Sequence, residues 1–313
     1  MSLDPVVQQA VKRTMELGTY SQTAVSRGAG LSTATISQYL KSTPENVVYK
    51  GDIDAVQKKL KTWADREAER FMAPRPPPFA PTAISEEITT VLRLAHVERV
   101  ICVVVGPPGV GKSATIDRYV RQVGDAILLT ANPNWDARAI LSGICAGMGA
   151  PSKGSTWQIA DRVMESLTGT GRLIIVDNAE FLKYPALETL RCIQDRARMG
   201  LVLCGMQRLY DTMIGRERGL YSHLFSRVSK CTVLSGEVER ADVTRIVKSV
   251  LPDASDMEME MFVVIANDQM GGRLRDLVQV LCHLKRTMNT THQRVSREMI
   301  REAGNLLMFR AKN

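Results

Sequence analysis

The sequence predicts an α/β fold, in which helices cover both faces of a parallel β-sheet, with an all-helical module before the sheet and a helical region after it. Three observations predict this arrangement. Apolar runs of four to six residues alternate with helical patterns between residues 100 and 234, as expected of strands buried on both faces. A proline-rich segment at 71–82 separates this region from an N-terminal part of about 70 residues without a strand pattern. Beyond residue 240 only helical patterns remain.

The composition is typical of a globular protein that binds a polyanion. The 313 residues are 44% hydrophobic and 24% charged, with a formal net charge of +8. No apolar stretch approaches the ~20 residues that a membrane-spanning helix needs, and the N-terminus lacks the apolar core of a secretory signal. The six cysteines form no C-x-x-C pair, which leaves zinc and redox motifs unsupported and favours a reducing, cytoplasmic location. We therefore expect no membrane partner.

The N-terminal module, residues 1–70, contains the pattern of a helix-turn-helix that binds double-stranded DNA. A short helix over 21–28 is followed by a glycine-bearing turn and by a second helix that begins at Ser32, whose hydroxyl can cap it. Apolar residues of the second helix share one face, whereas short polar residues suited to a DNA groove lie on the other. The predicted DNA-contacting residues are Ser32, Thr33, Thr35, Ser37 and Gln38. The alternative is a plain helical hairpin that contacts protein.

The helix-turn-helix is followed by another amphipathic helix over 52–71 and by the proline-rich linker, 71–82. The α/β core, 83–236, is predicted to contain strands at 100–105, 126–131, 172–177, 200–205 and 230–234. Its predicted helices are 112–123, 136–148, 155–167 and 186–197. The C-terminal region, 237–313, has helical patterns near 240–250, 257–268, 273–287 and 296–308. We expect these last helices to form a small lid on the core.

A nucleotide site is predicted where the first strand ends. The sequence GPPGVGKS, 106–113, matches G-x-x-x-x-G-K-[ST] between a strand and a helix, which is the context that this motif requires. Glycines let the loop turn so that backbone N–H groups face phosphate, and the helix N-terminus adds partial positive charge. Lys112 is expected to reach the β- and γ-phosphates of ATP, and Ser113 to bind Mg²⁺. The expected nucleotide-binding residues are Gly106, Pro107, Pro108, Gly109, Val110, Gly111, Lys112, Ser113 and Ala114.

The run RLIIVDNAEFL, 172–182, ends a buried strand in an aspartate. We expect Asp177 to hold the Mg²⁺ shell, the alternative being a cap for the next helix. P-loop ATPases usually place a glutamate next, to activate water, but here the next residue is Asn178, which can orient water without accepting a proton. Glu180 is the other candidate base, unless it only complements the dipole of the following helix. We therefore expect slow intrinsic ATP hydrolysis.

These parts, in this order, resemble the AAA+ ATPases, whose sheet has the strand order 5-1-4-3-2 and is followed by a helical lid. In GLVLCGMQ, Met206 stands where related transposition ATPases usually have asparagine as first sensor, so Gln207 is the nearest polar substitute. Arg227, in LFSR, stands where an arginine finger reaches the neighbouring subunit's ATP; the alternative is a surface salt bridge. The run GGRLRDL matches the G-x-x-R of the second sensor, which gives that role to Arg275, with Arg273 the less favoured candidate.

The whole layout is similar to one branch of that superfamily, the target-selecting ATPases of DNA transposition related to phage Mu transposition protein B. The similarity covers nearly the full chain and includes GLSTATIS, PPPF, IIVDNAEFL, GLVLCG and LFSRVSK besides the P-loop. It implies an ATPase that forms helical filaments with itself on DNA, with little sequence preference. It also implies delivery of that DNA to a DDE-type transposase in a bacterial host cytoplasm, with hydrolysis stimulated by DNA and transposase. The family form D-E-A-[DE] is not met at Asn178.

Two other functions fit the same motifs. A helix-turn-helix transcriptional regulator would read an operator and use its ATPase domain as a switch. A helicase loader or replication initiator of the same ATPase class would bind a replicative helicase. The sequence does not identify DNA contacts within the ATPase core; one candidate is 196–230, where seven Lys and Arg residues face two acidic ones, a net charge of +5. The alternative for that stretch is a solvated basic face.

Overall fold

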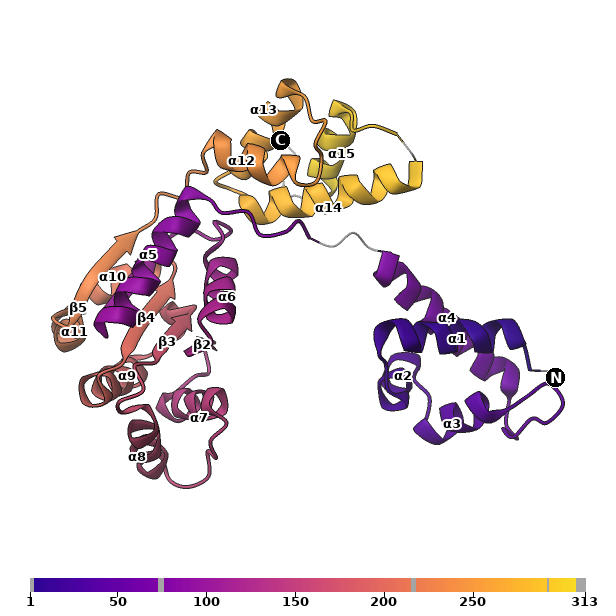
Figure 1. The fold of residues 1–313 in the computed structure, drawn as a ribbon, viewed down its shortest axis with the longest axis horizontal. Coiled ribbons are helices and arrows are strands. Elements are labelled where there is room, and N and C mark those ends of the chain that lie inside the picture. The colour runs from indigo at the N-terminus through magenta and orange to yellow at the C-terminus, as the bar shows by residue number, and fades with distance from the viewer. Residues whose placement is uncertain (1–2, 73–75, 215–217, 292, 308–313) are drawn as a thin grey trace. The chain divides into compact units, whose positions relative to one another are not determined.

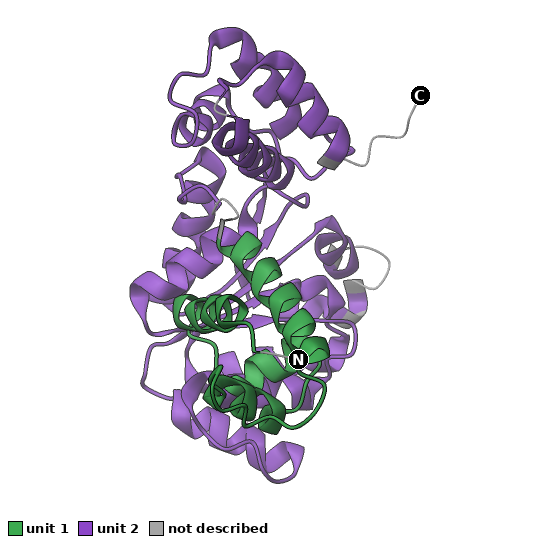
Figure 2. Cartoon of the chain, turned by 90° about the vertical axis from the view of Figure 1, so that its right-hand side faces the viewer, with its two compact units in different colours: residues 1–75 green, residues 76–313 purple. Residues whose placement is uncertain are grey.

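The chain forms two compact units, each with its own hydrophobic core. A computed structural model describes residues 3–72, 76–214, 218–291 and 293–307 (Figure 1). The units comprise residues 1–75 and 76–313, so the division falls within the proline-rich segment (Figure 2).

The first unit is all-helical in its described range. Its helices are α1 (Pro5–Gly18), α2 (Gln22–Ala29), α3 (Thr33–Lys41) and α4 (Ile53–Met72). The side chains of Asp4, Ser21 and Ser32 cap the first three helices by accepting hydrogen bonds from backbone N–H groups of the first turn. The core of the unit is formed by buried residues from all four helices, among them Val11, Val25, Ile36, Tyr39, Leu60 and Trp63. The helix α1 has no counterpart among the sequence predictions.

The second unit is built on a parallel sheet. Its strands in the described residues are β1 (Ile101–Val105), β2 (Ala126–Thr130), β3 (Leu173–Asp177), β4 (Gly200–Gly205) and β5 (Val228–Val233). The strand order is β2-β3-β4-β1-β5, which is 5-1-4-3-2 read from the other edge, so the predicted fold class and strand order are confirmed. Every neighbouring pair of strands is parallel, as the continuous apolar runs indicated.

Alternate residues of the strands face opposite layers of helices. Cys102 and Val104 of β1 belong to a cluster with α5 (Ala83–Glu98) and α6 (Lys112–Val123). Val103 and Val105 belong to a second cluster, on the other face. The helices of that second face are α7 (Ala137–Met148), α8 (Thr156–Leu167), α9 (Tyr184–Ala197), α10 (Gln207–Ile214) and α11 (Arg218–Phe225). A short 3-10 turn, η1 (Ala179–Phe181), follows β3.

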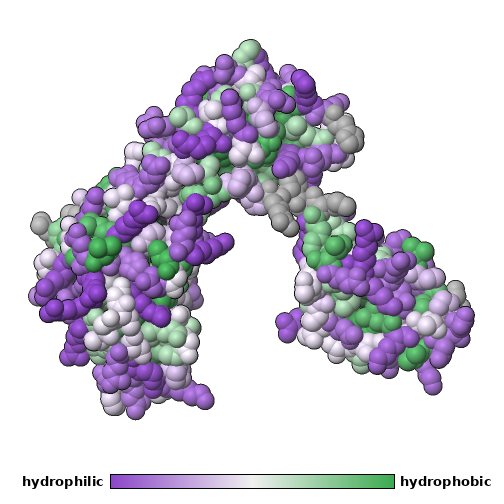
Figure 3. Space-filling view, viewed as in Figure 1, coloured by the Kyte–Doolittle hydropathy of each residue, from purple (hydrophilic) through white to green (hydrophobic). Residues whose placement is uncertain are grey.

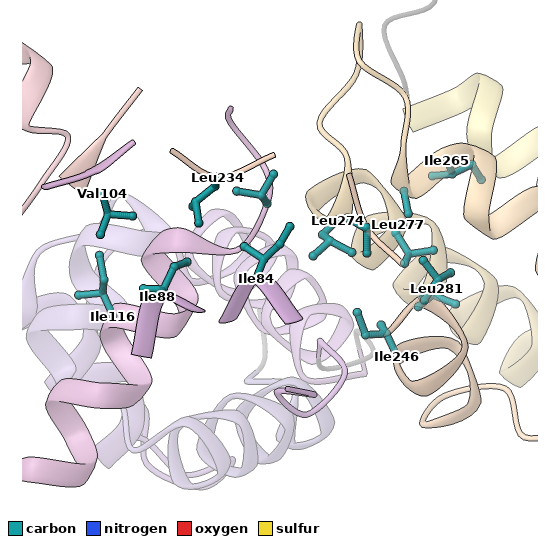
Figure 4. Close-up of a cluster of buried hydrophobic side chains, with 14 of the residues drawn as sticks. Ile84, Ile88, Val104, Ile116, Leu234, Ile246, Ile265, Leu274, Leu277 and Leu281 are labelled. Atoms are coloured by element: carbon teal, nitrogen blue, oxygen red, sulfur yellow. The ribbon is translucent and has the colours of Figure 1, made fainter. Parts of the chain in front are cut away.

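The lid packs onto the first of these clusters. Its described helices are α12 (Arg240–Lys248), α13 (Asp256–Ala266), α14 (Leu274–Thr291) and α15 (Arg297–Leu307). One continuous hydrophobic cluster joins core and lid. In Figure 4, Ile84 and Leu234 lie between the core residues Val104 and Ile116 and the lid residue Leu274. The lid is therefore held directly beside the end of the sheet where the P-loop lies.

Three features of the second unit differ from the sequence predictions. Helices α5, α10 and α11 had not been predicted, although α5 begins with a capping box between Thr82 and Ser85. The fifth strand begins at Val228 rather than at residue 230. Its residues 229–231 are exposed, so its apolar pattern is weak.

The surface seen in Figure 3 is largely hydrophilic, and the hydrophobic residues on it form separate patches. None of the helices in the described parts of the chain combines the length and the apolar character that crossing a bilayer requires.

Candidate nucleotide site

The P-loop connects the end of β1 to the start of α6. Gly109 and Gly111 adopt positive φ angles of 78° and 96°, a conformation that glycine adopts without steric cost. Gly111 is the N-cap of α6 and offers no capping side chain. The N–H groups of the first helical turn, Lys112 to Ala114, are therefore available to an anion.

A turn of the lid lies directly on this loop. A Cβ atom added at Gly109 would lie only 1.9 Å from the carbonyl oxygen of Gly272. The turn is itself fixed, because the backbone N–H of Gly272 donates to a carboxylate oxygen of Asp276 at 2.6 Å. The P-loop thus has its shape set both by its own glycines and by the turn before α14.

Lys112 is buried beneath the loop. Its Nζ donates to the carbonyl oxygens of Gly106, at 2.9 Å, and Pro107, at 2.8 Å. Burial lowers the pKa of Lys112 below its usual range, although the negative charges of Asp177 and Glu180 oppose the shift. An ammonium group that lacks full solvation gains most from an anion placed against it.

Ser113 and Asp177 lie in contact at the carboxyl-terminal ends of the strands. The Oγ of Ser113 donates to Oδ2 of Asp177 at 2.6 Å. Asp177 is buried at the end of β3, and its other oxygen accepts from the N–H of Asn178 at 3.0 Å. These groups fit Mg²⁺, which in nucleotide sites takes one or two protein ligands and completes its shell with water and phosphate. The described residues contain no cluster of three or more His, Cys, Asp or Glu suited to a metal.

The two candidates for positioning water differ in geometry. Asn178 has a left-handed backbone conformation, with φ of 57°, which asparagine tolerates better than glutamate does. Glu180 lies in η1, and its Oε2 accepts a hydrogen bond from the N–H of Met206 at 3.2 Å. The carboxylate of Glu180 therefore lies at the end of β4, beside Gly205.

Gln207, predicted as the first sensor, begins α10 and is exposed. Its amide donates to Asp211 on the same helix at 3.2 Å. In this segment it is the backbone N–H of Met206, and not the side chain of Gln207, that donates a hydrogen bond to Glu180. The side chain of Gln207 is thus not part of the group formed by Lys112, Ser113, Asp177 and Glu180.

The arginines predicted as finger and second sensor, Arg227, Arg275 and Arg273, differ in exposure. The side chain of Arg227 is 59% exposed, and its Nε lies 3.8 Å from Oδ1 of Asp195. Arg275 is exposed, and its charge contributes to the lowered pKa of Lys112, so it lies near Lys112. Arg273 is buried and donates from Nε to the carbonyl oxygen of Gly236 at 3.2 Å. Arg273 therefore ties the lid to the segment after β5, which leaves Arg275 as the arginine open to a nucleotide.

Comparison with known proteins relates this site to a family. Residues 95–213 match the AAA domain family. The chain is 32% identical over 290 residues to ATP-dependent target DNA activator B of Escherichia phage Mu, covering 91% of this chain and 89% of that protein. This chain belongs to the activator B family. The chain is also 31% identical over 268 residues to the Mu-like prophage FluMu DNA transposition protein B of Haemophilus influenzae. The match covers 83% of this chain and 89% of that protein.

The fold of this activator B family member is also found among solved structures. Domain III of the Thermotoga maritima replication initiation protein DnaA superposes with a TM-score of 0.50 at 15% identity, covering 74% of this chain and 95% of that one. At that identity the likeness shows a shared fold alone.

Two contacts of the site in this activator B family member had not been predicted. The Gly109–Gly272 approach and the Glu180–Met206 hydrogen bond each join segments that are far apart in the sequence. The glycine pair Gly271–Gly272 was the available signal for the first, since adjacent glycines often mark a close backbone approach. No local pattern indicates the second.

The predicted DNA-contacting residues of the same family member lie on the outer side of α3. Ser32, Thr33 and Gln38 are exposed, whereas Thr35 and Ser37 are half-buried. Ile36 and Tyr39 point into the core. Before α3, Gly30 turns the chain with φ of 63°, and Ser26 donates from Oγ to the carbonyl oxygen of Leu31 at 2.6 Å. The hydroxyl of Ser26, where helix-turn-helix motifs usually have alanine, thus braces the turn.

Proposed function

We propose that this chain is an ATPase that assembles, with ATP bound, into helical filaments on double-stranded DNA and activates that DNA as a target for a DDE-type transposase. Its relatives are named ATP-dependent target DNA activator B and DNA transposition protein B, which supports the DNA and transposition parts. The observation that carries the ATP part is the contact of Ser113 with Asp177 beside the buried Lys112.

ATP binds with its phosphates at the N-terminus of α6. The N–H groups of 109–114 and the ammonium of Lys112 stabilise the phosphate charge. Lys112 then exchanges its two carbonyl acceptors, on Gly106 and Pro107, for phosphate oxygens. Arg275 adds a second positive charge from the lid, in the role of second sensor. The lid turn at Gly272 therefore responds to whether the loop holds a nucleotide.

Ser113 and Asp177 would hold the metal. The hydroxyl of Ser113 would serve as a ligand, and the carboxylate of Asp177 would hold the metal's shell. When bound, Mg²⁺ neutralises charge on the phosphate oxygens.

Glu180 acts as the base that accepts the proton of the attacking water, and Asn178 orients that water. Glu180 is two residues further from the strand than the glutamate of the usual D-E form, and its carboxylate accepts a hydrogen bond from the N–H of Met206. Intrinsic hydrolysis is therefore slow, and DNA and the transposase increase it. A slow rate suits a filament that has to persist until a partner arrives.

Arg227 completes the ATP site of the neighbouring copy. Its side chain is largely exposed at the turn between α11 and β5, as a group that acts on another subunit has to be. An arginine supplied by a neighbouring subunit stabilises the charge that develops on the transferred phosphoryl group. Assembly and hydrolysis are therefore coupled.

DNA contact in the first unit is made by the outer side of α3, through Ser32, Thr33, Thr35, Ser37 and Gln38. Phosphate contacts from Lys and Arg supply most of the affinity, so binding depends little on sequence and weakens steeply with salt.

Binding of random-sequence duplexes by the full chain tests the proposal. With ATP, we expect uniform coverage of any long duplex and an affinity that falls ~10³-fold or more between about 50 and 200 mM salt. A triple variant, Thr33→Ala, Ser37→Ala and Gln38→Ala, is expected to weaken binding to all sequences alike. Protection of a single short palindrome, with or without ATP, would indicate a transcriptional regulator, and stable binding to a replicative helicase would indicate a loader. Either result would overturn the proposal.

A further inference from the structure

Three ion pairs connect charged residues of α9 to Arg227, which lies in the turn after α11. Arg191 lies between two acidic residues of its own helix: it binds Oε1 of Glu188 through Nε, at 2.8 Å, and Oδ2 of Asp195 through Nη1. Its hydrogen bonds lower the pKa of Glu188, so the carboxylate of Glu188 stays charged at neutral pH. Asp195 is therefore held by one oxygen, Oδ2, while its other oxygen, Oδ1, faces Arg227.

The ion pair of Arg227 with Asp195 is recorded at the inner nitrogen of the guanidinium, Nε. The ion pair joins Nε of Arg227 to Oδ1 of Asp195 at 3.8 Å. Within the described part of the chain, the guanidinium of Arg227 makes no hydrogen bond, and its ion pair with Asp195 is at Nε. The outer edge of the guanidinium, which binds phosphate oxygens in pairs, is thus left open.

The contact at Nε indicates that Asp195 positions the Arg227 side chain rather than sequestering its guanidinium. A carboxylate that sequestered the arginine would accept hydrogen bonds from two guanidinium nitrogens at once, because the bidentate pair is the most favourable arrangement. A contact to Nε limits the directions of the side chain and keeps the phosphate-binding edge free. Exposed ion pairs contribute little to folding stability, so the contact has little value for the fold itself.

The helix that bears Asp195 also leads to the chain's own nucleotide site. The turn η1, with Glu180, ends at Phe181, and α9 begins at Tyr184. The ring of Tyr184 packs edge-on against Tyr221 of α11, with ring centroids 5.5 Å apart. The start of α9 therefore lies beside η1 and α11, and Asp195, near the end of α9, faces Arg227 in the turn after α11.

We propose that Asp195 is a positioning residue that aims Arg227 at the triphosphate of the adjoining copy. The inference rests on the proposed role of Arg227 in trans. Arg191 holds one oxygen of Asp195, and the other oxygen lies 3.8 Å from Nε of Arg227.

The test compares DNA-stimulated ATP turnover by the full chain and by Asp195→Asn, Arg227→Ala and the double variant. Asparagine keeps the size of the side chain and removes its charge. We expect Asp195→Asn to lower kcat about tenfold, less than the ~10²-fold that a 1 Å misplacement can cost, with KM for ATP changed less than about twofold. The double variant is expected to be no slower than Arg227→Ala alone, and Asp195→Glu to recover part of the lost rate.

Melting temperature and a control variant separate this role from a structural one. Asp253→Asn, at an exposed position of the lid, is expected to match the parent. If the double variant is slower than Arg227→Ala by the same factor by which Asp195→Asn is slower than the parent, the two residues act independently and the inference is overturned. A rise in turnover of Asp195→Asn above the parent would also overturn it, because it would show that Asp195 sequesters Arg227. Normal turnover by Asp195→Asn, with Arg227→Ala impaired, would overturn the inference and leave the proposed function standing. Normal turnover by Arg227→Ala would overturn the proposed finger itself.

Discussion

The carboxylate of Glu180 accepts a hydrogen bond from the backbone N–H of Met206, with 3.2 Å between Oε2 and the nitrogen. Glu180 follows β3 and Met206 follows β4, so the bond joins two neighbouring strands at the edge of the sheet where Asp177 lies. A side chain at position 205 would collide with this carboxylate, because a Cβ there would lie 2.3 Å from Oε2. Glycine at 205 thus admits Glu180 to the site.

Replacing Glu180 by glutamine tests its role as base. Glutamine has the same shape and can still accept the N–H of Met206, but it cannot accept a proton. We expect ATP turnover on DNA to fall by a factor on the order of 10²–10⁴, with ATP affinity retained. Glu165→Gln, on α8, serves as the control. Equal rates for Glu180→Gln and the parent would exclude Glu180 as the base.

A matched pair of glycine variants tests the contact between P-loop and lid. Gly109 and Gly124 have similar φ angles, 78° and 76°, so alanine costs roughly 1–2 kcal/mol of backbone strain at either position. Only at Gly109 does the added Cβ meet another atom, the carbonyl oxygen of Gly272, at 1.9 Å. We expect Gly109→Ala to abolish binding of a fluorescent ATP analogue and Gly124→Ala to preserve it. Parental affinity in Gly109→Ala would show that the lid turn does not constrain the loop.

ATP affinity should depend on alkaline pH through Lys112. Burial lowers the pKa of this lysine in the free protein, so its deprotonation begins below the ~10.4 of an unperturbed lysine. Because phosphate stabilises the protonated form, affinity falls as pH rises through the lowered pKa, and ATP binding takes up protons there. Titration calorimetry in two buffers of different ionisation enthalpy measures this uptake. The same observed enthalpy in both buffers, with constant affinity, would contradict the expectation.

Tyr39→Phe should stabilise the first unit without changing DNA affinity. The Tyr39 hydroxyl is buried and has no hydrogen-bond partner in the described residues, so removing it is expected to raise the free energy of unfolding by about 1 kcal/mol. Tyr39 belongs to the core, on the side of α3 away from the predicted DNA contacts. Calorimetry and a DNA-binding titration measure the two effects. Tyr49→Phe, at a half-buried position, is the control.

The same variant has a pH signature. Burial raises the pKa of Tyr39 to about 12, so the folded unit holds this proton more tightly than the unfolded chain does, whose tyrosine pKa is about 10. The resulting stability is fully present below about pH 10 and is lost as the pH rises through about 12. Tyr39→Phe should lack that part of the alkaline loss. An identical loss in parent and variant would contradict the assignment to Tyr39.

The fold could be predicted from the sequence wherever burial imposes a local pattern. The strands ending at Val105, Asp177 and Gly205 are buried along their whole length, and each was predicted. The exposure of residues 229–231 weakens the apolar pattern of β5. Helices α10 and α11 are short, with eight residues each, so their periodicity is difficult to recognise.

The candidate site was predictable in part for the same reason. The P-loop motif is contiguous, and parallel strands bring its end to the end of β3, as the Ser113–Asp177 contact confirms. Contacts between distant segments leave no local pattern. The glycine turn over Gly109, the amide of Met206 and the carboxylate of Asp195 are of this kind, and they emerge only from tertiary structure.

Electron microscopy of the chain on plasmid DNA tests the central claim, that ATP held at 106–113 joins adjoining copies into a coat on the duplex. The parent protein is expected to coat the DNA with ATP and to leave it bare without nucleotide. The Lys112→Ala variant is expected to leave the DNA bare even with ATP. Coating by Lys112→Ala in the absence of nucleotide, as dense as that of the parent with ATP, would contradict the account.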